Sequence, residues 1–213
     1  MPTITKIISQ RRSENRRNVY LDGRFAFGCN TNVVARFRLC EGLNLTPEQL
    51  REIEYGEVKQ ECFDKAMKFL QQRLHSRAEL HKKLGRKEWG AEVIDATLND
   101  LARLGYLDDE RFARTKALGA AEHKRHGRRR AFVELIRSGV RGDVATAALD
   151  DVYSKTDSIV IARDVARKNA ERLKKLDRVV ARRRLAGLLQ RRGFGYDTIR
   201  PVIDEVLGEP RDE

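Results

Sequence analysis

The chain has 213 residues, of which 40% are hydrophobic and 36% are charged, and its formal net charge is +12. This length suffices for one large domain or two small ones, and the charged fraction, well above the usual quarter or so, indicates thin helical layers with much solvated surface. No apolar run reaches the roughly 18 residues that suggest a membrane span, and the first ten residues lack the apolar core of a signal peptide. We therefore expect a cytoplasmic protein with no membrane partner.

Residues 3–28 predict a small antiparallel sheet. A β-rich run over residues 3–9 is followed by two short β-rich runs that flank Asp22-Gly23. Asp-Gly between such runs favours a hairpin, because a type I′ turn needs positive φ at both central residues. The charged residues 11–17 are interpreted as the connection before the hairpin. A three-stranded sheet of this size needs a helix to pack against.

Helices are predicted from residue 31 onward. A helix over residues 31–39 precedes a second one that begins after Thr46. Thr46 and Gln49 can form a capping box, with a proline at the first helical position between them. Gly56 is expected to break this helix before a longer helix over residues 57–74.

The remainder of the chain contains three copies of one pattern, spaced 51 and then 54 residues apart. Four apolar anchors recur, and the second, third and fourth lie 5, 14 and 17 residues after the first. Self-similarity at this scale indicates a modular array in which each unit buries its apolar face partly against its neighbour. The anchors are Leu84, Trp89, Leu98 and Leu101, then Leu135, Val140, Leu149 and Val152, then Leu189, Phe194, Ile203 and Val206.

Each copy is predicted to hold three helices. The expected fold is mainly α, with tandem three-helix repeats in an elongated, curved array and a small N-terminal β-hairpin or sheet region. The expected domains are residues 1–56, the N-terminal hairpin and helices, and the three repeats 57–107, 108–155 and 156–213. Helix starts in the repeats are predicted at five N-cap positions, namely Ser76, Asp108 or Asp109, Asp143, Asp177 and Asp197.

No catalytic constellation is present in the sequence. It contains no phosphate-binding glycine loop, no HExxH and no GxSxG. His123 and His126 lie in a basic stretch and are interpreted as solvated, and the acids 108–110 are interpreted as a helix cap and first turn. Cys29, Cys40 and Cys62 lack CxxC spacing and are interpreted as core residues. We expect no enzymatic activity, no metal site and no cofactor.

Positive charge is concentrated in the second and third copies. Residues 111–155 hold eleven basic and five acidic residues, and residues 156–213 hold fourteen and ten, whereas residues 62–110 are neutral. A concentrated positive field attracts polyanions, and the arginine fork suits phosphates and carboxylates. The candidate binding residues are Lys82, Lys83, Arg86, Lys87, Lys124, Arg125, Arg128, Arg129, Arg130, Arg137, Arg141, Lys174, Lys175, Arg178, Arg182, Arg183, Arg184, Arg191 and Arg192.

Three segments of the helical part carry a recognisable pattern. They are 105–113 (GYLDDERFA), 76–84 (SRAELHKKL), and Gly127 with the basic residues after it and Gly139-Val140. These segments resemble the RecX family, bacterial regulators of the RecA recombinase. The resemblance covers residues 57–207, and the hairpin at residues 20–23 resembles the segment that precedes the helices in longer members.

The resemblance implies a non-enzymatic protein that binds the RecA–DNA filament in its helical groove. We expect the chain to be a monomer. The resemblance implies lower strand exchange, ATP hydrolysis and coprotease activity in DNA repair and the SOS response. It carries over no catalytic residues and no mapped binding residues, so the candidate positions depend on charge alone. The resemblance favours inhibition, and the sequence itself does not distinguish inhibition from assistance.

The alternative is a stand-alone DNA-binding protein, because three helices joined by tight turns also describe helix-turn-helix units. Residues 91–104 and 143–152 would then supply reading helices, yet Arg103 is the one basic residue they contain. Contact with the backbone of single- or double-stranded DNA through the second helices remains open under both hypotheses.

Overall fold

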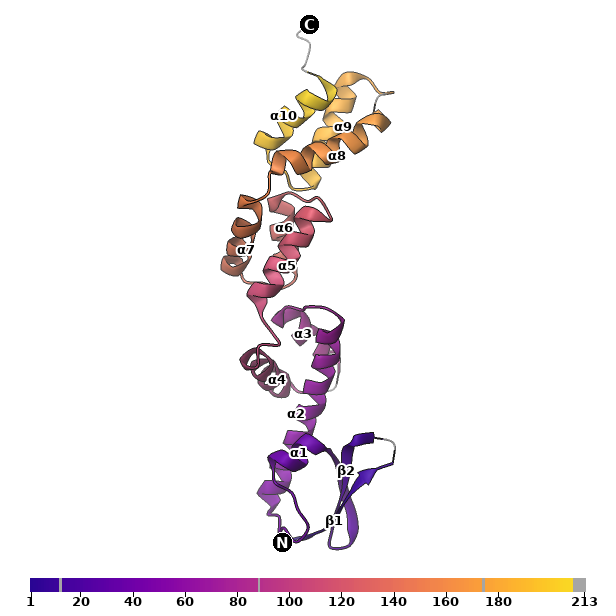
Figure 1. Cartoon of the computed structure of the whole chain (residues 1–213), viewed down its shortest axis with the longest axis vertical. Coiled ribbons are helices and arrows are strands. Elements are labelled where there is room, and N and C mark those ends of the chain that lie inside the picture. The colour runs from indigo at the N-terminus through magenta and orange to yellow at the C-terminus, as the bar shows by residue number, and fades with distance from the viewer. Residues whose placement is uncertain (12, 88, 174, 209–213) are drawn as a thin grey trace. The chain divides into compact units, whose positions relative to one another are not determined.

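The computed structural model describes residues 1–11, 13–87, 89–173 and 175–208. Within these residues, three strands are followed by ten helices (Figure 1), which confirms a mainly α fold with a small N-terminal sheet and three-helix repeats. The chain forms two compact units. The N-terminal unit comprises residues 1–74 and 80–107, and the C-terminal unit comprises residues 75–79 and 108–213.

The sheet is antiparallel, with the order β1-β2-β3. Its strands are β1 (Ile4–Gln10), β2 (Ser13–Leu21) and β3 (Arg24–Asn30). Asp22 and Gly23 have φ values of 50° and 78°, so the predicted tight turn is confirmed.

The prediction that residues 11–17 form a connection was wrong from Ser13 onward, because β2 begins there. Arg16 and Arg17 pair with Asn30 and Cys29 of β3. Charged residues are tolerated in this strand because their side chains find polar partners outside the apolar core.

Two helices cover the sheet region, α1 (Thr31–Arg36) and α2 (Pro47–Gln72). The capping box at Thr46 is confirmed. The expected break at Gly56 was wrong, since α2 is continuous. A Cβ at this position would lie 2.6 Å from the Phe37 ring, so the glycine makes room for an aromatic side chain.

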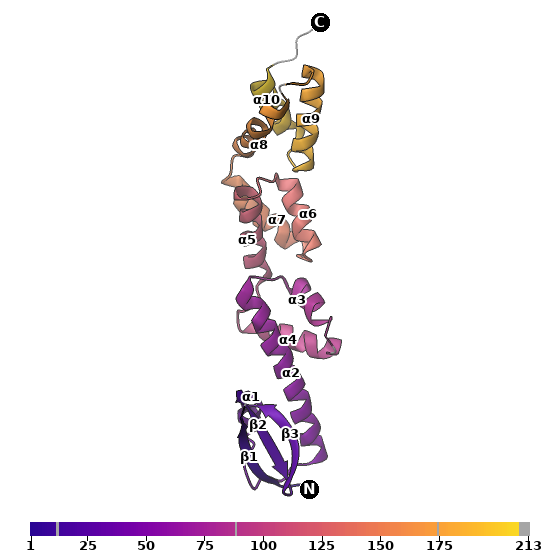
Figure 2. The same cartoon turned by 90° about the vertical axis from the view of Figure 1, so that its right-hand side faces the viewer.

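The core of this region lies between the sheet and the two helices, and Figure 2 shows the sheet beside α2. Its buried residues are Ile4, Val19, Cys29, Val33, Leu39, Leu45 and Ile53. Cys29 and Cys62 are buried, as expected of core residues, but Cys40 is exposed. Burial raises the pKa of Cys29 to about 11, so this thiol stays protonated and is a poor nucleophile.

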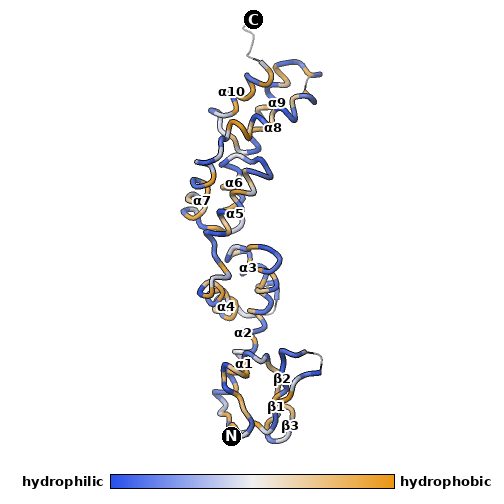
Figure 3. The backbone as a smooth tube through the Cα atoms, in the orientation of Figure 1, coloured by the Kyte–Doolittle hydropathy of each residue, from blue (hydrophilic) through white to orange (hydrophobic). Residues whose placement is uncertain are grey.

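The first repeat adds α3 (Arg77–Leu84) and α4 (Ala91–Arg103) to the C-terminal half of α2. The second repeat is α5 (Asp109–Glu122), α6 (Arg128–Arg137) and α7 (Gly142–Ser154). The third is α8 (Ser158–Leu173), α9 (Arg178–Arg191) and α10 (Tyr196–Leu207). In the second and third repeats the last helix packs against the first and second, and Figure 3 shows hydrophobic and hydrophilic residues alternating along the helices.

The repeated anchors occupy equivalent places. In each repeat the first anchor lies in the second helix, the next in the following loop, and the last two in the third helix. Leu84, Leu135 and Leu189 are fully buried, and among the other nine anchors Trp89 and Val206 alone are partly exposed. The 51- and 54-residue periods therefore correspond to repeated packing.

The second helices of repeats 2 and 3 end in the same way. Gly139 and Gly193 adopt φ values of 74° and 87°. The next N–H group, of Val140 or Phe194, donates to the carbonyl of Leu135 or Leu189 at 3.2 Å. This left-handed ending satisfies the last carbonyls and turns the apolar anchor into the core.

Two of the predicted N-cap residues were wrong and the others were confirmed. Asp108 and Asp177 cap α5 and α9 through backbone N–H groups, and Ser76 Oγ accepts from the Glu79 N–H at 3.0 Å. Asp143 and Asp197 are not caps, since the N-cap residues are Arg141 and Gly195. Both acids lie instead in the first turn, where the helix dipole favours them.

Candidate polyanion-binding surface

The predicted basic residues fall into two groups. The residues of one group interact with a carboxylate, a backbone carbonyl, an aromatic ring or another partner, and those of the other group have no such partner among the described residues. The distinction matters because a cation that is already paired contributes less to binding an external anion. Lys174 lies outside the described residues.

Three members of the first group join the second repeat to the third. The Arg192 guanidinium donates to the Lys124 carbonyl at 2.8 Å, and Arg130 donates to the Arg191 carbonyl at 2.9 Å. Arg125 of the second repeat forms an ion pair with Asp164 of the third. These side chains hold the repeats together.

Two glycines permit the backbones to approach at this junction. The Gly127 N–H donates to the Arg192 carbonyl at 2.8 Å. A Cβ at Gly127 would lie 2.4 Å from the Gly193 carbonyl oxygen, and a Cβ at Gly193 would lie 2.4 Å from the Arg130 nitrogen. Any larger residue would force the repeats apart.

His126 lies in the loop between α5 and α6. Its side chain is buried, contrary to the prediction of a solvated side chain. Its Nδ1 lies 3.1 Å from Glu134 Oε1, and its carbonyl accepts from the Tyr153 hydroxyl at 2.7 Å. Burial lowers the pKa of His126, and the cations Arg130, Lys124 and Arg192 lower it further, while Glu134 opposes the shift. The backbone carbonyl of His126 therefore helps to hold the loop in place, and the lowered pKa favours the neutral imidazole.

Other predicted residues are also engaged. Arg128 and Arg141 pair with Asp150 and Asp143. Arg182 pairs with Asp204 and donates to the Gly208 carbonyl. Lys83 lies 4.6 Å from the centroid of the Phe69 ring, Lys124 pairs with Glu134 at 2.9 Å, and Arg178 also has a partner.

The second group is available for an external anion. Its side chains make no hydrogen bond or ion pair with any residue that the structure describes. They are Lys82, Arg86, Lys87, Arg129, Arg137, Lys175, Arg183, Arg184 and Arg191.

Two members of this group, Arg129 and Arg183, line a pocket of about 630 Å³ in the C-terminal unit. Arg200 of α10 joins them, together with Tyr196 and the buried Phe194. Sequence reasoning missed Arg200 and Tyr196. Their i, i+4 spacing places them on one face of a helix, and that signal could have found them.

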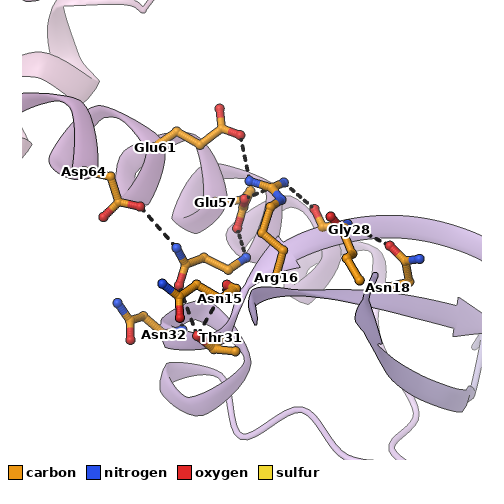
Figure 4. Close-up of polar contacts among 11 residues, drawn as sticks. Asn15, Arg16, Asn18, Gly28, Thr31, Asn32, Glu57, Glu61 and Asp64 are labelled. Carbon is orange, nitrogen blue, oxygen red and sulfur yellow. Dashed lines mark hydrogen bonds and ion pairs between the residues drawn. The ribbon is translucent and has the colours of Figure 1, made fainter. Parts of the chain in front are cut away.

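A contrasting arginine occupies the N-terminal unit (Figure 4). Arg16 contacts Glu57 at 2.9 Å and Glu61 at 3.2 Å, and donates to the Gly28 carbonyl at 3.2 Å. Burial raises the pKa of Glu57, whose Oε2 also accepts from the Asn30 N–H at 2.7 Å. This network attaches the sheet to α2.

Among the described residues, no three His, Cys, Asp or Glu side chains gather as a metal site would require. Within the same ranges, no helix combines the length and apolar character that crossing a bilayer demands.

The fold and these surfaces define a helical-repeat protein that presents unpaired cations. Family models match residues 2–46 (Regulatory protein RecX N-terminal domain), 62–101 (RecX, first three-helix domain) and 157–203 (RecX, third three-helix domain). "Regulatory protein RecX" of Bacillus velezensis is 32% identical over 213 residues, which cover 100% of this chain and 81% of the relative. The Bacillus subtilis protein of that name is 32% identical over 209 residues, covering 97% and 78%. The chain belongs to the RecX family.

Solved structures agree on the fold. A crystal structure of regulatory protein RecX aligns with a TM-score of 0.82 at 21% identity, covering 96% of this chain and 100% of that one. The RecX structure from Lactobacillus salivarius aligns with a TM-score of 0.62 at 21% identity, covering 71% and 97%.

Proposed function

We propose that this chain is a non-enzymatic inhibitor of the RecA recombinase that acts in the cytoplasm by binding the RecA–DNA filament. Membership of a family of regulatory proteins supports regulation in general. The observation that carries the proposal is the set of exposed basic side chains in the C-terminal unit that have no carboxylate partner among the described residues, including Arg129, Arg183 and Arg184. A protein filament on DNA offers many anionic groups, which such a surface complements.

Inhibition requires a difference in affinity between two states of the filament. A protein that bound the active and inactive filament equally well would shift nothing, however tight the complex. We propose that this chain binds the inactive arrangement more tightly, which lowers ATP hydrolysis, strand exchange and coprotease activity together.

ATP turnover by RecA on single-stranded DNA tests the proposal. Micromolar protein is expected to lower turnover, and the double variant Arg129→Glu/Arg183→Glu is expected to lose most of that effect. Arg24→Glu is the matched control, since Arg24 is also exposed and has no partner among the described residues. Unchanged turnover in the presence of the native chain would end the proposal.

The stand-alone DNA-binding protein is the second candidate. A helix-turn-helix unit inserts its last helix into the major groove. Here α7 has no basic residue, and Arg103 of α4 pairs with Asp100 at 3.2 Å. These two helices are therefore poorly suited to reading bases. Gel shifts test the candidate, and a sequence-specific, salt-tolerant complex with DNA would favour it over the first.

A further inference from the structure

The pocket of the C-terminal unit combines features that the regulatory proposal does not use. We propose that it binds an unpaired base of single-stranded DNA, with the neighbouring phosphates held by Arg129, Arg183 and Arg200. The inference deepens the proposed function and rests on it for its biological meaning, because it assigns the DNA component of the filament to this pocket.

The aromatic lining suits a base. Tyr196 is 74% exposed, whereas Phe194 is 3% exposed and lies with Ile199 and Ile203 at the apolar side of the pocket. An exposed ring beside an apolar surface offers a stacking platform. Stacking of one base on an aromatic side chain contributes about 1–3 kcal/mol.

The charged lining suits the backbone on either side of that base. Arg129 comes from α6, Arg183 from α9 and Arg200 from α10, so three helices bring their cations to one pocket. None of the three has a partner among the described residues. The fourth arginine, Arg182, is already neutralised by Asp204, and no carboxylate is among the described residues that line the pocket.

A single strand fits this arrangement better than a duplex or an acidic peptide. A duplex presents phosphates outside and keeps its bases stacked inside, so Tyr196 and the apolar side would have no partner. An acidic peptide would satisfy the arginines but lacks a planar group at each step along its length. A single strand supplies a planar base and a phosphate at every step, and Gln190 in the lining offers an amide for a base edge.

The test uses the full chain without RecA, a fluorescein-labelled oligo(dT) and a hairpin duplex of similar charge. Tyr196→Ala is expected to weaken oligo(dT) binding about tenfold and to leave duplex binding unchanged, while Tyr196→Phe retains the native affinity. Arg200→Ala is expected to reduce the salt slope for oligo(dT) by about 0.7. Tyr106→Ala is the matched control, since Tyr106 is also exposed but lies in the N-terminal unit.

Two outcomes would overturn the inference, and a third would separate it from the proposed function. If Tyr196→Ala lost affinity for oligo(dT) and for the duplex equally, the pocket would be an unspecific electrostatic patch. If Tyr196→Ala kept the native affinity for oligo(dT) but no longer inhibited RecA, the pocket would be a protein-binding site. Base-dependent binding as expected, with RecA turnover unaffected by the native chain, would keep the pocket assignment and refute the proposed function.

Discussion

Two arginines, one in each unit, lie in opposite electrostatic settings. Arg16 of the N-terminal unit contacts two carboxylates and a carbonyl, whereas Arg129 of the C-terminal unit has no partner among the described residues. The first is structural, because removing it would leave the largely buried Glu57 without its cation. The second is available to another molecule. The number of charges in a segment therefore says less about binding than the partners of each charge.

The largest expected effect concerns the junction between the second and third repeats, where Gly193 lies. Gly193→Ala should destabilise the C-terminal unit by about 2–5 kcal/mol, because a left-handed backbone is strained by a Cβ and that Cβ would overlap the backbone of Arg130. Urea unfolding of the full chain measures the change.

Gly119→Ala provides the matched control. Gly119 lies inside α5, and a Cβ there would meet nothing within 4 Å. This variant should gain about 0.5–1 kcal/mol. Equal stability of the two variants would show that the junction does not require close backbone approach.

The next effect tests the structural arginine directly. Arg16→Ala should cost about 1–3 kcal/mol, because Glu57, whose side chain is 13% exposed, loses its ion-pair partner. Arg24→Ala in the same sheet should stay within about 0.5 kcal/mol of the native chain. Thermal melts of both variants check the difference. Similar melting temperatures would show that Arg16 has no special structural role.

A smaller effect separates two neighbouring arginines. Arg130→Ala should cost about 1 kcal/mol, since it removes a hydrogen bond to the Arg191 carbonyl and a contact with Glu134 at 3.5 Å. Arg129→Ala should leave the free energy of unfolding nearly unchanged and weaken anion binding. Measuring both stability and oligo(dT) affinity for each variant tests this division; a destabilising Arg129→Ala would contradict it.

The smallest effect is a dependence on pH. Because the folded-state pKa of His126 is lowered, chiefly by burial, the unfolded chain binds more protons between that pKa and the ordinary value. Stability should therefore fall as the pH drops from above about 6.5 toward the folded pKa. His126→Asn should flatten this part of the profile of unfolding free energy against pH, and an unaltered profile would show that His126 is not its source.

Much of the fold could be predicted because local chemistry determines it. The Asp22-Gly23 turn, the Thr46 capping box and the spacing of the anchors each follow from short-range rules. The break at Gly56 could not be judged correctly, because the glycine accommodates Phe37 from another element. Likewise, residues 13–17 are too charged to be predicted as a strand from the sequence, because the partners of Arg16 lie on α2.

The candidate site was predictable as a charged region but not residue by residue. Sequence reasoning treated Arg128, Arg129 and Arg130 alike. The pairing of Arg128 with Asp150 spans 22 residues and that of Arg125 with Asp164 spans 39, so it depends on how the helices pack. Arg200 was missed because it stands alone in the sequence, and folding brings it to Arg129 and Arg183.

The start of α3 has a practical consequence for dividing the chain. Residues 75–79 belong to the C-terminal unit, where Ser76 donates to the Ser138 carbonyl and the Arg77 N–H donates to Asp109 at 2.8 Å. Leu80 and Leu84, a few residues later, are buried in the core of the other unit. A fragment beginning at residue 108 would lack these two hydrogen bonds. A fragment beginning at residue 75 would expose Leu80 and Leu84 to solvent. Neither half can be excised cleanly at a single peptide bond.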